Sequence, residues 1–555
     1  MRPANTISDL PGRAHRLYER DSFVTAVFLL VALCSWSGPV VALESGDDAN
    51  MAQGTQQRQA AAPMYIREYR VEEAHLLKPI EIEEAVYPYL GPGRTADDVE
   101  HARAALEQAY KDKGFQTVSV QIPPQQARGG VVVLQVIENR VGRLRVHGSR
   151  YFSLEQIKKG APSLVEGKAV DFNQVTRDIV ALNQLPDRRI TPSLRAGVEP
   201  NTVDVDLTVK DTFPLHGSIE LNNRYSADTV ELRLNGSVSY NNLWQLGHSA
   251  GFSFQIAPED VEEVKVFSGF YTVRVPSLPW VNLMLQATKQ DSNVSTLGGS
   301  AVAGKGEVVG ERLNFTLPAG TNFFHFFNFG IDYKHFDQNI VIGTSVIKSP
   351  ISYYPFSAAY GATWAFKGST TEFNSDLTFH LRGLGSNQKV YDNRRFNSDG
   401  SFIYLRSDLA HTHELPWGFQ AYGKVQGQIS NAPLVDSEQF AGGGLGTARG
   451  YLESTALGDN ALFGTVELRT PPLLPWFGDK TEWRLYTFCD AGCLTLRNPL
   501  PEQQSRFNLA SVGVGSRIRL MDHLNGSLDA GWPLVQQSVT SPNDLLLTVR
   551  VWAEF

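Results

Sequence analysis

The sequence has little cysteine, little charge and almost no long hydrophobic run. It holds 3 cysteines in 555 residues, too few for a disulfide scaffold, and no cluster of cysteines, histidines and carboxylates has metal-ligand spacing. Charged residues make up 19% and the net charge is -8, which indicates no basic face for nucleic acid. The mean hydropathy of -0.21 argues against a bundle of transmembrane helices. We therefore expect no metal, no cofactor and no nucleic-acid partner.

The longest apolar run lies near the N-terminus. Phe23–Trp36 follows several arginines and precedes the small residues of Ser37–Ala42, a pattern typical of a secretory signal over residues 1–42. A membrane anchor would need about 20 apolar residues, and this run is shorter. Residues 43–63, which include the Gln- and Ala-rich stretch Ala52–Ala62, are expected to form a flexible linker.

Residues 64–140 and 141–212 repeat one polar α+β pattern. In the first, Val99–Lys113 has helical periodicity, with Val99, Ala102, Leu106 and Tyr110 on one face. The other predicted elements are strands at Thr117–Ile122, Val131–Ile137, Val141–His147, Thr191–Leu194 and Val203–Val209, a helix that starts at Ser153 and a helix over Phe172–Asn183. This order, with Gly114-Phe115 after a helix, resembles the POTRA domain. The resemblance implies two units that bind an extended client at a strand edge; a pair of α/β spacer domains is the alternative.

Residues 213–555 change to a period of two. Apolar and polar residues alternate over Val230–Tyr240, Leu246–Ile256, Tyr354–Phe366, Phe373–Leu381 and Phe419–Ile429. Periodicity alone does not separate a soluble sandwich from a barrel with a polar lumen. About 340 residues at about 21 residues per strand and turn give about sixteen antiparallel strands, a size known for all-β transmembrane barrels. Aromatic residues near segment ends, among them Trp280, Trp364, Trp417 and Trp476, suit interfacial girdles.

The end of the chain also alternates. Leu545, Leu547, Val549, Val551, Ala553 and Phe555 share one apolar face. Val549, Val551 and Phe555 resemble the signature that the barrel assembly machinery reads. A last strand that pairs with the first would also leave the sheet without exposed edges.

One glycine-rich loop segment carries a single arginine. The five glycines of Gly442–Tyr451 let the backbone adopt positive φ and lie close to a wall, where Arg449 can anchor it. Without other context, such a segment would be an ordinary solvated loop. The segment and the downstream Phe488–Gly492 together resemble the [VA]RG[YF] loop motif and the F-x-D-x-G strand motif of the two-partner secretion transporters, the outer-membrane haemolysin secretion and activation family. The motif positions are Gly444, Ala448, Arg449, Gly450 and Tyr451, in a loop of about 430–460, and Phe488, Asp490 and Gly492 in a strand.

The resemblance implies that the loop folds back into a sixteen-stranded barrel and that Arg449 meets Asp490. Ala448 departs from the family pattern, in which valine is commoner, without changing the charge. Alternation places Asp490, Phe488 and Tyr486 in the lumen and Cys489 on the lipid side. A charge-assisted pair contributes about 1.5 to 3 kcal/mol. We expect this to bias the loop without locking it, so that an incoming client can displace it.

The function that the resemblance implies is an outer-membrane pore whose periplasmic POTRA domains recognise an unfolded secreted partner and pass it to the cell surface or medium. The expected partners are one large secreted protein, adhesin-like or haemolysin-like, the outer-membrane lipid and the barrel assembly machinery. The alternatives are an assembly factor for outer-membrane proteins, which usually carries more POTRA units, and a passive porin, which needs neither these units nor the loop.

One segment matches an enzyme motif. Gly247–Gly251 reads G-x-S-x-G, which requires Ser249 to stand on a turn between a strand and a helix. The residues that follow instead continue a strand, with Phe252, Phe254 and Ile256 alternating with polar residues. We therefore predict that the chain is not an enzyme.

Overall fold

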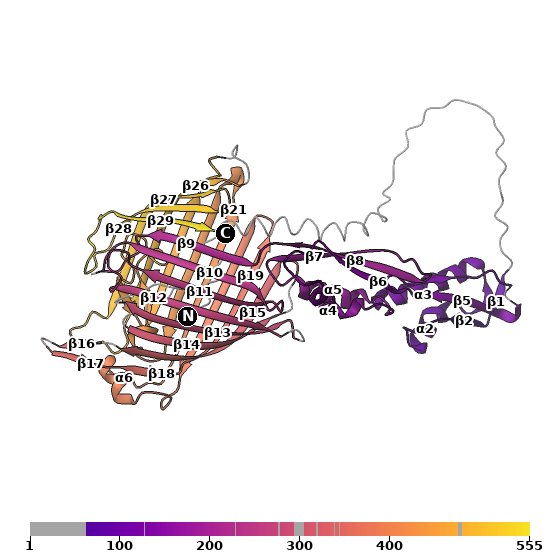
Figure 1. Ribbon diagram of the computed structural model, residues 1–555, viewed down its shortest axis with the longest axis horizontal. Helices are drawn as coiled ribbons and strands as arrows, with labels where there is room; N and C mark the ends of the chain where they lie inside the picture. Colours follow the sequence, from indigo (N-terminus) through magenta and orange to yellow (C-terminus); the bar gives the residue numbers. More distant parts are fainter. Residues whose placement is uncertain are drawn as a thin grey trace, which may run out of the picture. The chain divides into compact units, whose positions relative to one another are not determined.

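The computed structural model describes most of the chain after residue 62 (Figure 1). The described ranges are 63–126, 128–227, 229–275, 278–292, 305–317, 320–337, 339–342, 345–474 and 480–555. The expected signal at 1–42, nearly all of the expected linker and the expected girdle residue Trp476 lie outside these ranges. The described residues form two compact units, which divide in the sequence between Phe213 and Pro214.

The N-terminal unit begins with a subdomain in which helices pack on a three-stranded sheet of order β2-β5-β4. Its elements are β1 (Met64–Ile66), β2 (Glu68–Glu72), α2 (Pro79–Val86), η2 (Tyr87–Tyr89), β3 (Gly91–Arg94), α3 (Ala96–Asp112), β4 (Ser119–Gln121), η3 (Arg128–Gly130) and β5 (Val131–Ile137). Strand β2 runs parallel to β5, and β4 runs antiparallel to it. The expected apolar face of α3 is buried and forms much of this core.

Helix α3 starts three residues before its apolar periodicity does. The Asp98 carboxylate accepts hydrogen bonds from the backbone N of Thr95, at 2.8 Å, and from the Thr95 hydroxyl, at 3.1 Å. The two residues therefore cap each other at the helix N-terminus. Asp97 and Asp98 lie in the first turn, where a negative charge favours the helix dipole.

A second subdomain repeats this design with a sheet of order β6-β8-β7. Its elements are β6 (Arg140–His147), α4 (Leu154–Lys159), η4 (Pro162–Leu164), α5 (Phe172–Leu182), β7 (Arg188–Ala196) and β8 (Thr202–Asp211). Ser153 caps α4 as expected, since its hydroxyl accepts from the backbone N of Gln156. Both helices pack on the sheet around a separate apolar core.

The two subdomains meet at Gly114, just after α3. The Gly114 carbonyl accepts a hydrogen bond from the backbone N of Phe172, at 2.9 Å, and the Asn173 side chain donates to the carbonyl of Lys113 at 3.3 Å. Gly114 has φ +101, and a Cβ there would lie 2.6 Å from Asn173 Nδ2 and 2.7 Å from Asp171 Oδ1. Glycine is therefore required both by the backbone conformation and by the close approach of α5.

The C-terminal unit is a closed antiparallel barrel (Figure 1). Its strands are β9 (Leu215–Asn222), β10 (Arg233–Leu243), β11 (His248–Ile256), β12 (Val264–Arg274), β13 (Val281–Ser292), β14 (Lys305–Thr316), β15 (Phe323–Asp337), β18 (Ile351–Tyr353), β19 (Phe356–Phe366), β20 (Ser369–His380), β21 (Phe402–Glu414), β22 (Gln420–Ser430), β25 (Asn460–Arg469), β26 (Glu482–Thr495), β27 (Arg506–Leu520), β28 (Leu524–Pro533) and β29 (Leu546–Glu554). Strands β18 and β19 both pair with β15 and are separated by Tyr354 and Pro355. Counted as one strand, they give sixteen strands in the described barrel, as predicted.

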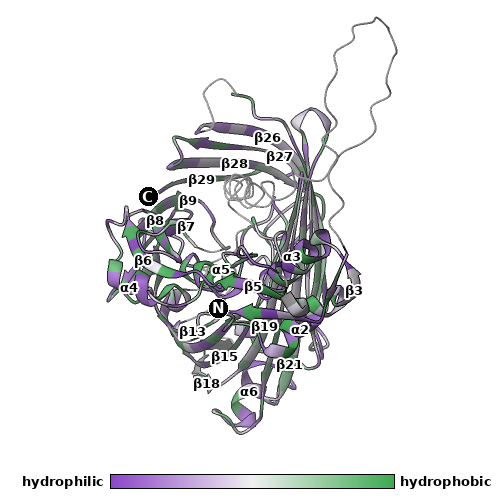
Figure 2. Ribbon diagram, turned by 90° about the vertical axis from the view of Figure 1, so that its right-hand side faces the viewer, coloured by the Kyte–Doolittle hydropathy of each residue, from purple (hydrophilic) through white to green (hydrophobic). Residues whose placement is uncertain are grey.

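Polar and apolar residues alternate along these strands, as Figure 2 shows. On β14, every second residue from Gly306 to Arg312 is buried inside, and the residues between them are exposed. Inward-facing polar residues that are buried include Gln255, Thr288, Gln290, Arg312, Asp332 and Gln428, and outward apolar residues that are exposed include Val309, Leu313, Val425, Val466, Leu468 and Val551. The barrel is therefore polar inside and apolar outside, which is the arrangement of a lipid-embedded barrel.

The start of β10 differs from the alternation, which predicts a strand from Val230. The backbone N of Val230 donates to the Glu263 side chain at 2.9 Å, and that of Leu232 donates to Glu259 at 3.3 Å. The strand begins only at Arg233, because acidic side chains of the next connection take the amides that a neighbouring strand would otherwise bind.

Strand β29 closes the barrel on β9. This seam pairs five residues, from Arg550 opposite Asn222 to Glu554 opposite Ser218, whereas β26 and β27 pair fourteen. Across the seam, the Arg550 guanidinium binds the Glu220 carboxylate with two hydrogen bonds of 3.0 Å. With β18 and β19 counted as one strand, a bidentate pair thus reinforces the shortest pairing between neighbouring strands in the described barrel.

The barrel has a near end, where β9 begins and β29 ends, and an opposite far end. Because the strands alternate in direction, the connections after β15, β20 and β22 lie at the far end. They carry the hairpin β16 (Asn339–Ile342) and β17 (Ser345–Lys348), helix α6 (Gln388–Arg394), and η7 (Asp436–Glu438) with the hairpin β23 (Phe440–Gly442) and β24 (Ala456–Gly458). The short η6 (Pro416–Gly418) lies at the near end.

In the part of the chain that the structure describes, every helix is too short or too polar to cross a bilayer.

Candidate functional site

The motif loop comprises residues 431–459, between β22 and β25. Its two arms pair as β23 and β24, from Phe440 opposite Gly458 to Gly442 opposite Ala456. Beyond this ladder the chain curls: the backbone N of Gly444 donates to the carbonyl of Tyr451 at 3.1 Å, and the Thr447 hydroxyl bonds the backbone of Gly443. This curl, residues 443–455 between β23 and β24, is the tip of the loop and carries Arg449.

Arg449 binds the barrel wall from inside. Its Nε and Nη2 donate to the two carboxylate oxygens of Asp490, at 2.9 and 2.8 Å, and its backbone N also donates to Asp490, at 3.0 Å. Its Nη1 donates to Glu467 at 2.5 Å. Arg449 is 5% exposed and Asp490 is 1% exposed. The expected Arg449–Asp490 pair is therefore present, and it is buried.

An aromatic ring completes the arginine site. The central guanidinium carbon of Arg449 lies 3.6 Å from the centroid of the Phe488 ring, on the same strand as Asp490. Gly513, opposite Phe488 on β27, leaves the space for that ring, since a Cβ there would lie 2.2 Å from it. The first position of the F-x-D-x-G motif thus stacks on the cation that the third position binds.

The site extends beyond the pair that the motifs predict. Glu467 also accepts from Arg469, with Nη2 at 2.7 Å, and lies 3.5 Å from Arg517. Asp529 lies 3.7 Å from Arg449 and accepts a hydrogen bond of 2.7 Å from the Tyr486 hydroxyl. Three cations and three carboxylates therefore balance one another inside the barrel; they are Arg449, Arg469, Arg517, Glu467, Asp490 and Asp529.

Sequence reasoning missed the other charged residues of this site, which are Glu467, Arg469, Arg517 and Asp529. A signal existed, because Glu467 and Arg469 alternate with the exposed apolar residues Val466 and Leu468 and must face the lumen with Asp490. The larger set of partners also changes the expected energetics. Breaking a buried ion pair by removing one partner costs about 3 to 5 kcal/mol. That is more than the value of about 1.5 to 3 kcal/mol expected from the sequence for a single charge-assisted pair.

Gly450 and Tyr451 seat the tip against β27 and β28. Gly450 has φ +96, and a Cβ there would lie 3.1 Å from the backbone N of Pro533. The Tyr451 hydroxyl donates to the carbonyls of Ala510 and Val535, at 3.0 and 2.7 Å, and the ring is almost fully buried. The loop therefore approaches the wall through its backbone as well as through Arg449.

The remaining motif positions are packing positions. Ala448 is fully buried in a cluster with Phe440, Phe463 and Leu494. Gly492 lies beneath Phe463, since a Cβ there would be 2.2 Å from the ring. These small residues let the loop and the wall approach each other closely.

Gly444 faces a further residue that the motifs do not include. A Cβ at Gly444 would lie 2.2 Å from the carboxylate of Glu453, which accepts a hydrogen bond of 2.7 Å from Arg224 Nε in the connection after β9. Glu453 also donates its backbone N to the carbonyl of Tyr225. The tip is thus tied to a second connection, and no periodicity in the sequence predicts this contact.

The expected C-terminal residues lie on the outer face. Val549 and Val551 point outward from β29 and are exposed. Phe555 exchanges two backbone hydrogen bonds with Gly217, and its ring lies where a Cβ at Gly217 would be, at 2.4 Å. The ring therefore covers the start of β9 at the seam.

The other motifs considered in the sequence form neither a metal-ligand cluster nor a nucleophile turn among the described residues. Within it, no three His, Cys, Asp or Glu side chains come together as metal ligands. Ser249 lies within β11, in a strand that continues to Ile256, so the G-x-S-x-G match does not form a strand-to-helix turn. Cys489 and Cys493 both lie on β26 and are unpaired by disulfides.

Comparisons with known proteins agree with this geometry. A model of the POTRA domain of ShlB type matches residues 64–139. A model described as haemolysin secretion/activation protein ShlB/FhaC/HecB matches residues 201–518, more than half of the chain. The chain belongs to this family.

Relatives of this ShlB/FhaC/HecB chain include the outer membrane transporter CdiB of Dickeya dadantii strain 3937, which is 22% identical over 88% of this chain and 86% of its own length. The heme/hemopexin transporter protein HuxB of Haemophilus influenzae strain 86-028NP is 18% identical over 69% of this chain and 66% of its own. Among solved structures, CdiB from Escherichia coli matches with a TM-score of 0.64 at 18% identity, over 98% of this chain and 99% of that one. This last likeness shows the shared fold.

The family places the molecule in the cell. The chain is an outer-membrane two-partner secretion transporter, with POTRA domains in the periplasm and a sixteen-stranded barrel in the membrane. Members of the family are secretion pores that pair with large secreted proteins. Strand β9 follows the periplasmic unit directly in the chain and begins at the near end of the barrel, so the near end faces the periplasm. The far end, which carries the motif loop, faces outward.

Proposed function

We propose that the motif loop of this transporter is the gate of its pore, closed when Arg449 binds Asp490 and Glu467. The observation that carries this proposal is that a loop from the outer end reaches inward and buries a charged side chain among carboxylates of three separate strands. A secreted chain that enters the lumen competes with these contacts. The gate opens when the tip is displaced, and no covalent step is needed.

Arg449→Ala tests the gate directly. The variant removes the cation that binds Asp490, so the tip no longer holds the pore in its working conformation. We therefore expect secretion of the partner to fall at least tenfold while the barrel still assembles. The matched control is Arg382→Ala, which removes an exposed arginine paired with Asp399 in another far-end connection. Secreted partner is measured in the medium, and assembly by heat-modifiable migration of the folded barrel. Normal secretion by Arg449→Ala would sink the gate.

Recognition of the partner falls to the N-terminal unit. The two sheets have the orders β2-β5-β4 and β6-β8-β7, so β2, β4, β6 and β7 lie at sheet edges within the described residues. An unfolded client adds a strand at one of these edges through main-chain hydrogen bonds. Hydrogen exchange on the full-length protein, with and without the N-terminal part of the secreted partner, should show added protection on one edge strand. Equal protection on the central strands β5 and β8 would contradict this mode of binding.

The partner itself is a single large adhesin-like or haemolysin-like protein. Folding of that protein outside the cell supplies the free energy for its transport. The transporter itself carries out no catalysis. Residues 1–42 act as its secretory signal, 43–63 as a linker, 64–140 and 141–212 as two POTRA units and 213–555 as the barrel. Val549, Val551 and Phe555 present the signal that the barrel assembly machinery reads.

Comparing cells with and without the gene tests the choice of partner. We expect one large polypeptide to disappear from the medium or the cell surface while other barrels persist. A joint fall of many outer-membrane proteins would instead indicate an assembly factor.

A further inference from the structure

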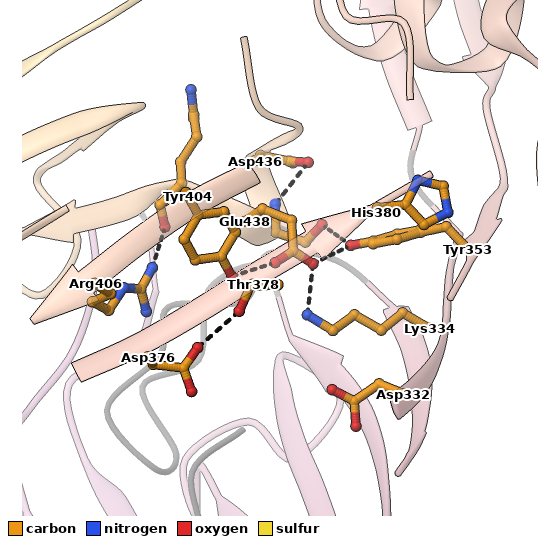
Figure 3. Close-up of polar contacts among 12 residues, drawn as sticks. Asp332, Lys334, Tyr353, Asp376, Thr378, His380, Tyr404, Arg406, Asp436 and Glu438 are labelled. Carbon is orange, nitrogen blue, oxygen red and sulfur yellow. Dashed lines mark hydrogen bonds and ion pairs between the residues drawn. The ribbon is translucent and has the colours of Figure 1, made fainter. Parts of the chain in front are cut away.

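A second buried charge in the motif loop lies apart from the Arg449 site. Glu438, at the end of η7, is 1% exposed. Its carboxylate accepts hydrogen bonds from Lys334 Nζ at 2.6 Å, from the Tyr353 hydroxyl at 2.7 Å and from the Tyr404 hydroxyl at 2.7 Å. Figure 3 shows these three side chains converging on Glu438. They come from β15, β18 and β21, none of which contributes to the Arg449 site.

The surroundings of Glu438 are apolar as well as hydrogen-bonded. Leu434 and Val435, which precede η7, are buried at 0% and 1% exposure in a cluster of far-end residues. The other buried members of this cluster are Val308, Phe336, Ile351, Tyr353, Tyr391, Phe402 and Tyr404. Tyr391 belongs to α6, so the helix after β20 helps to hold this part of the loop.

A third contact ties the two arms of the loop together. Asp459, at the end of the loop, is fully buried. It accepts hydrogen bonds from the backbone N of Leu434 at 2.9 Å, from Gln439 Nε2 at 3.0 Å and from the backbone N of Arg497 at 2.7 Å. The base of the motif loop, residues 432–439 with Asp459, is therefore a packed element of the barrel.

Glu438 of the base and Arg449 of the tip bind different strands of the wall, on either side of the β22–β25 pairing. The loop leaves β22 and returns to β25; the Arg449 side chain contacts carboxylates on β25, β26 and β28, whereas the Glu438 side chain contacts β15, β18 and β21. The tip uses one cation on a glycine-rich backbone, and the base combines a buried ion pair with an apolar core. Loss of the Arg449 contacts removes none of the contacts of the base.

We propose that Glu438 is a second, independent anchor of the motif loop, a positioning residue that fixes the base to β15, β18 and β21 while the Arg449 tip is released. The inference rests on the proposed gate and adds that only the tip of the motif loop moves when the gate opens. The loop bends between Glu438 and Arg449, and the base stays in the outer mouth of the pore throughout secretion. A carboxylate with one ammonium and two phenol donors specifies one position for the base, which apolar packing alone would not.

The test measures the base and the tip separately. Single cysteines are placed at buried positions, Val435→Cys for the base and Ala448→Cys for the tip, in full-length protein whose Cys34, Cys489 and Cys493 are replaced by alanine. The rate of labelling by a water-soluble maleimide then reports how often each part leaves the wall. Heat-modifiable migration confirms that each variant has assembled.

Loss of each anchor should change the labelling rate at one of the two cysteine positions and not at the other. We expect Glu438→Gln to raise labelling at position 435 at least tenfold and to change labelling at position 448 less than twofold. Arg449→Ala should do the reverse. The matched control is Glu307→Gln, which breaks a Lys–Glu pair of the same type whose side chains are 76% and 53% exposed, and it should change neither rate. Should Glu438→Gln fail to assemble, Tyr404→Phe removes one hydrogen bond and should raise labelling at position 435 about threefold.

Two results would overturn the second anchor. One is a joint rise at both positions in both variants, which would mean that the loop moves as one body. The other is unchanged labelling at position 435 in the assembled Glu438 or Tyr404 variant. Secretion measured on the same cells keeps the gate separate: normal secretion by Arg449→Ala overturns the gate, whereas the labelling pattern decides the anchor by itself.

Discussion

The guanidinium of Arg449 stacks on the ring of Phe488 and forms a bidentate ion pair with Asp490, two residues further along the same strand. Alternation puts both wall residues on the lumenal face, so one strand supplies a flat surface and a two-oxygen clamp. A planar, delocalised cation fits this arrangement, and a compact ammonium does not.

Arg449→Lys separates charge from shape. The lysine keeps the positive charge but cannot form the bidentate pair or stack in the same way, so we expect secretion to fall at least tenfold, close to the Arg449→Ala level. Secreted partner is quantified against the amount of assembled barrel. Arg382→Lys, in an exposed pair, is the control and should secrete normally. Full secretion by Arg449→Lys would show that charge alone holds the tip.

Gly492→Ala tests the packing role of the last motif glycine. The new Cβ would meet the Phe463 ring, which is buried, and such overpacking typically costs about 1 to 3 kcal/mol. We expect the barrel to lose its heat-resistant migration at a lower temperature. Adding Phe463→Leu should recover part of the loss. Gly464→Ala on β25 is the control, because a Cβ there meets only a carbonyl oxygen at 3.9 Å; equal losses in both variants would exclude a specific contact.

Alternation along single strands could be predicted from the sequence because it is a local property. It placed Asp490 inside and Cys489 outside, and the structure has both where expected. It does not tell which residues meet across the lumen. Glu438 and Lys334 are 104 residues apart, and Arg224 and Glu453 are 229 apart; neither pair lies in a motif. Only closure of the barrel and folding of the loop bring them together.

Element boundaries failed for a different reason. The strand predicted from Val230 begins at Arg233, where the Glu263 side chain binds the backbone amide of Val230. The helix predicted from Val99 begins at Ala96, where the Asp98 side chain binds the backbone amide of Thr95. Such caps depend on single polar residues and leave the apolar period unchanged, so the period alone predicts the element but not its first residue.

The stability of helix α3 should depend on pH through Asp98. The hydrogen bond from the Thr95 backbone lowers the pKa of the Asp98 carboxyl below its ordinary value. A depressed pKa in the folded state means that the ionised carboxylate stabilises the helix above the unfolded pKa of about 3.9, and that this contribution is lost as the pH falls through the folded value.

Hydrogen exchange over residues 96–112 of the full-length protein, corrected for the intrinsic rate, measures this effect. We expect Asp98→Asn to lower protection of α3 at neutral pH. The difference from the natural protein should shrink as the pH falls below the unfolded pKa of about 3.9 and through the lower folded pKa, where the carboxylate is protonated. A difference that stays constant across this range would contradict the assignment.

Gly114→Ala should loosen the joint between the two subdomains. A methyl group there meets both Asn173 and Asp171 at the start of α5, and φ is +101. We expect the distribution of distances between spin labels on α3 and α4 to broaden. Gly91→Ala is the control, since Gly91 has φ +113 and no atom lies within 4 Å of its Cβ position. It carries the same backbone strain without the contact, and an equal broadening would show that strain alone is responsible.

The seam between β29 and β9 sets the order in which the barrel can form. Glu220 and Arg550 are 330 residues apart, so their pairing has a far larger contact order than the hairpins that join neighbouring strands. Local hairpins form early because their loops close at little entropic cost. We therefore expect the sheet to grow as an open, curved sheet with two unpaired edge strands. The Glu220–Arg550 ion pair then forms last, when β9 and β29 pair and the sheet has no free edge.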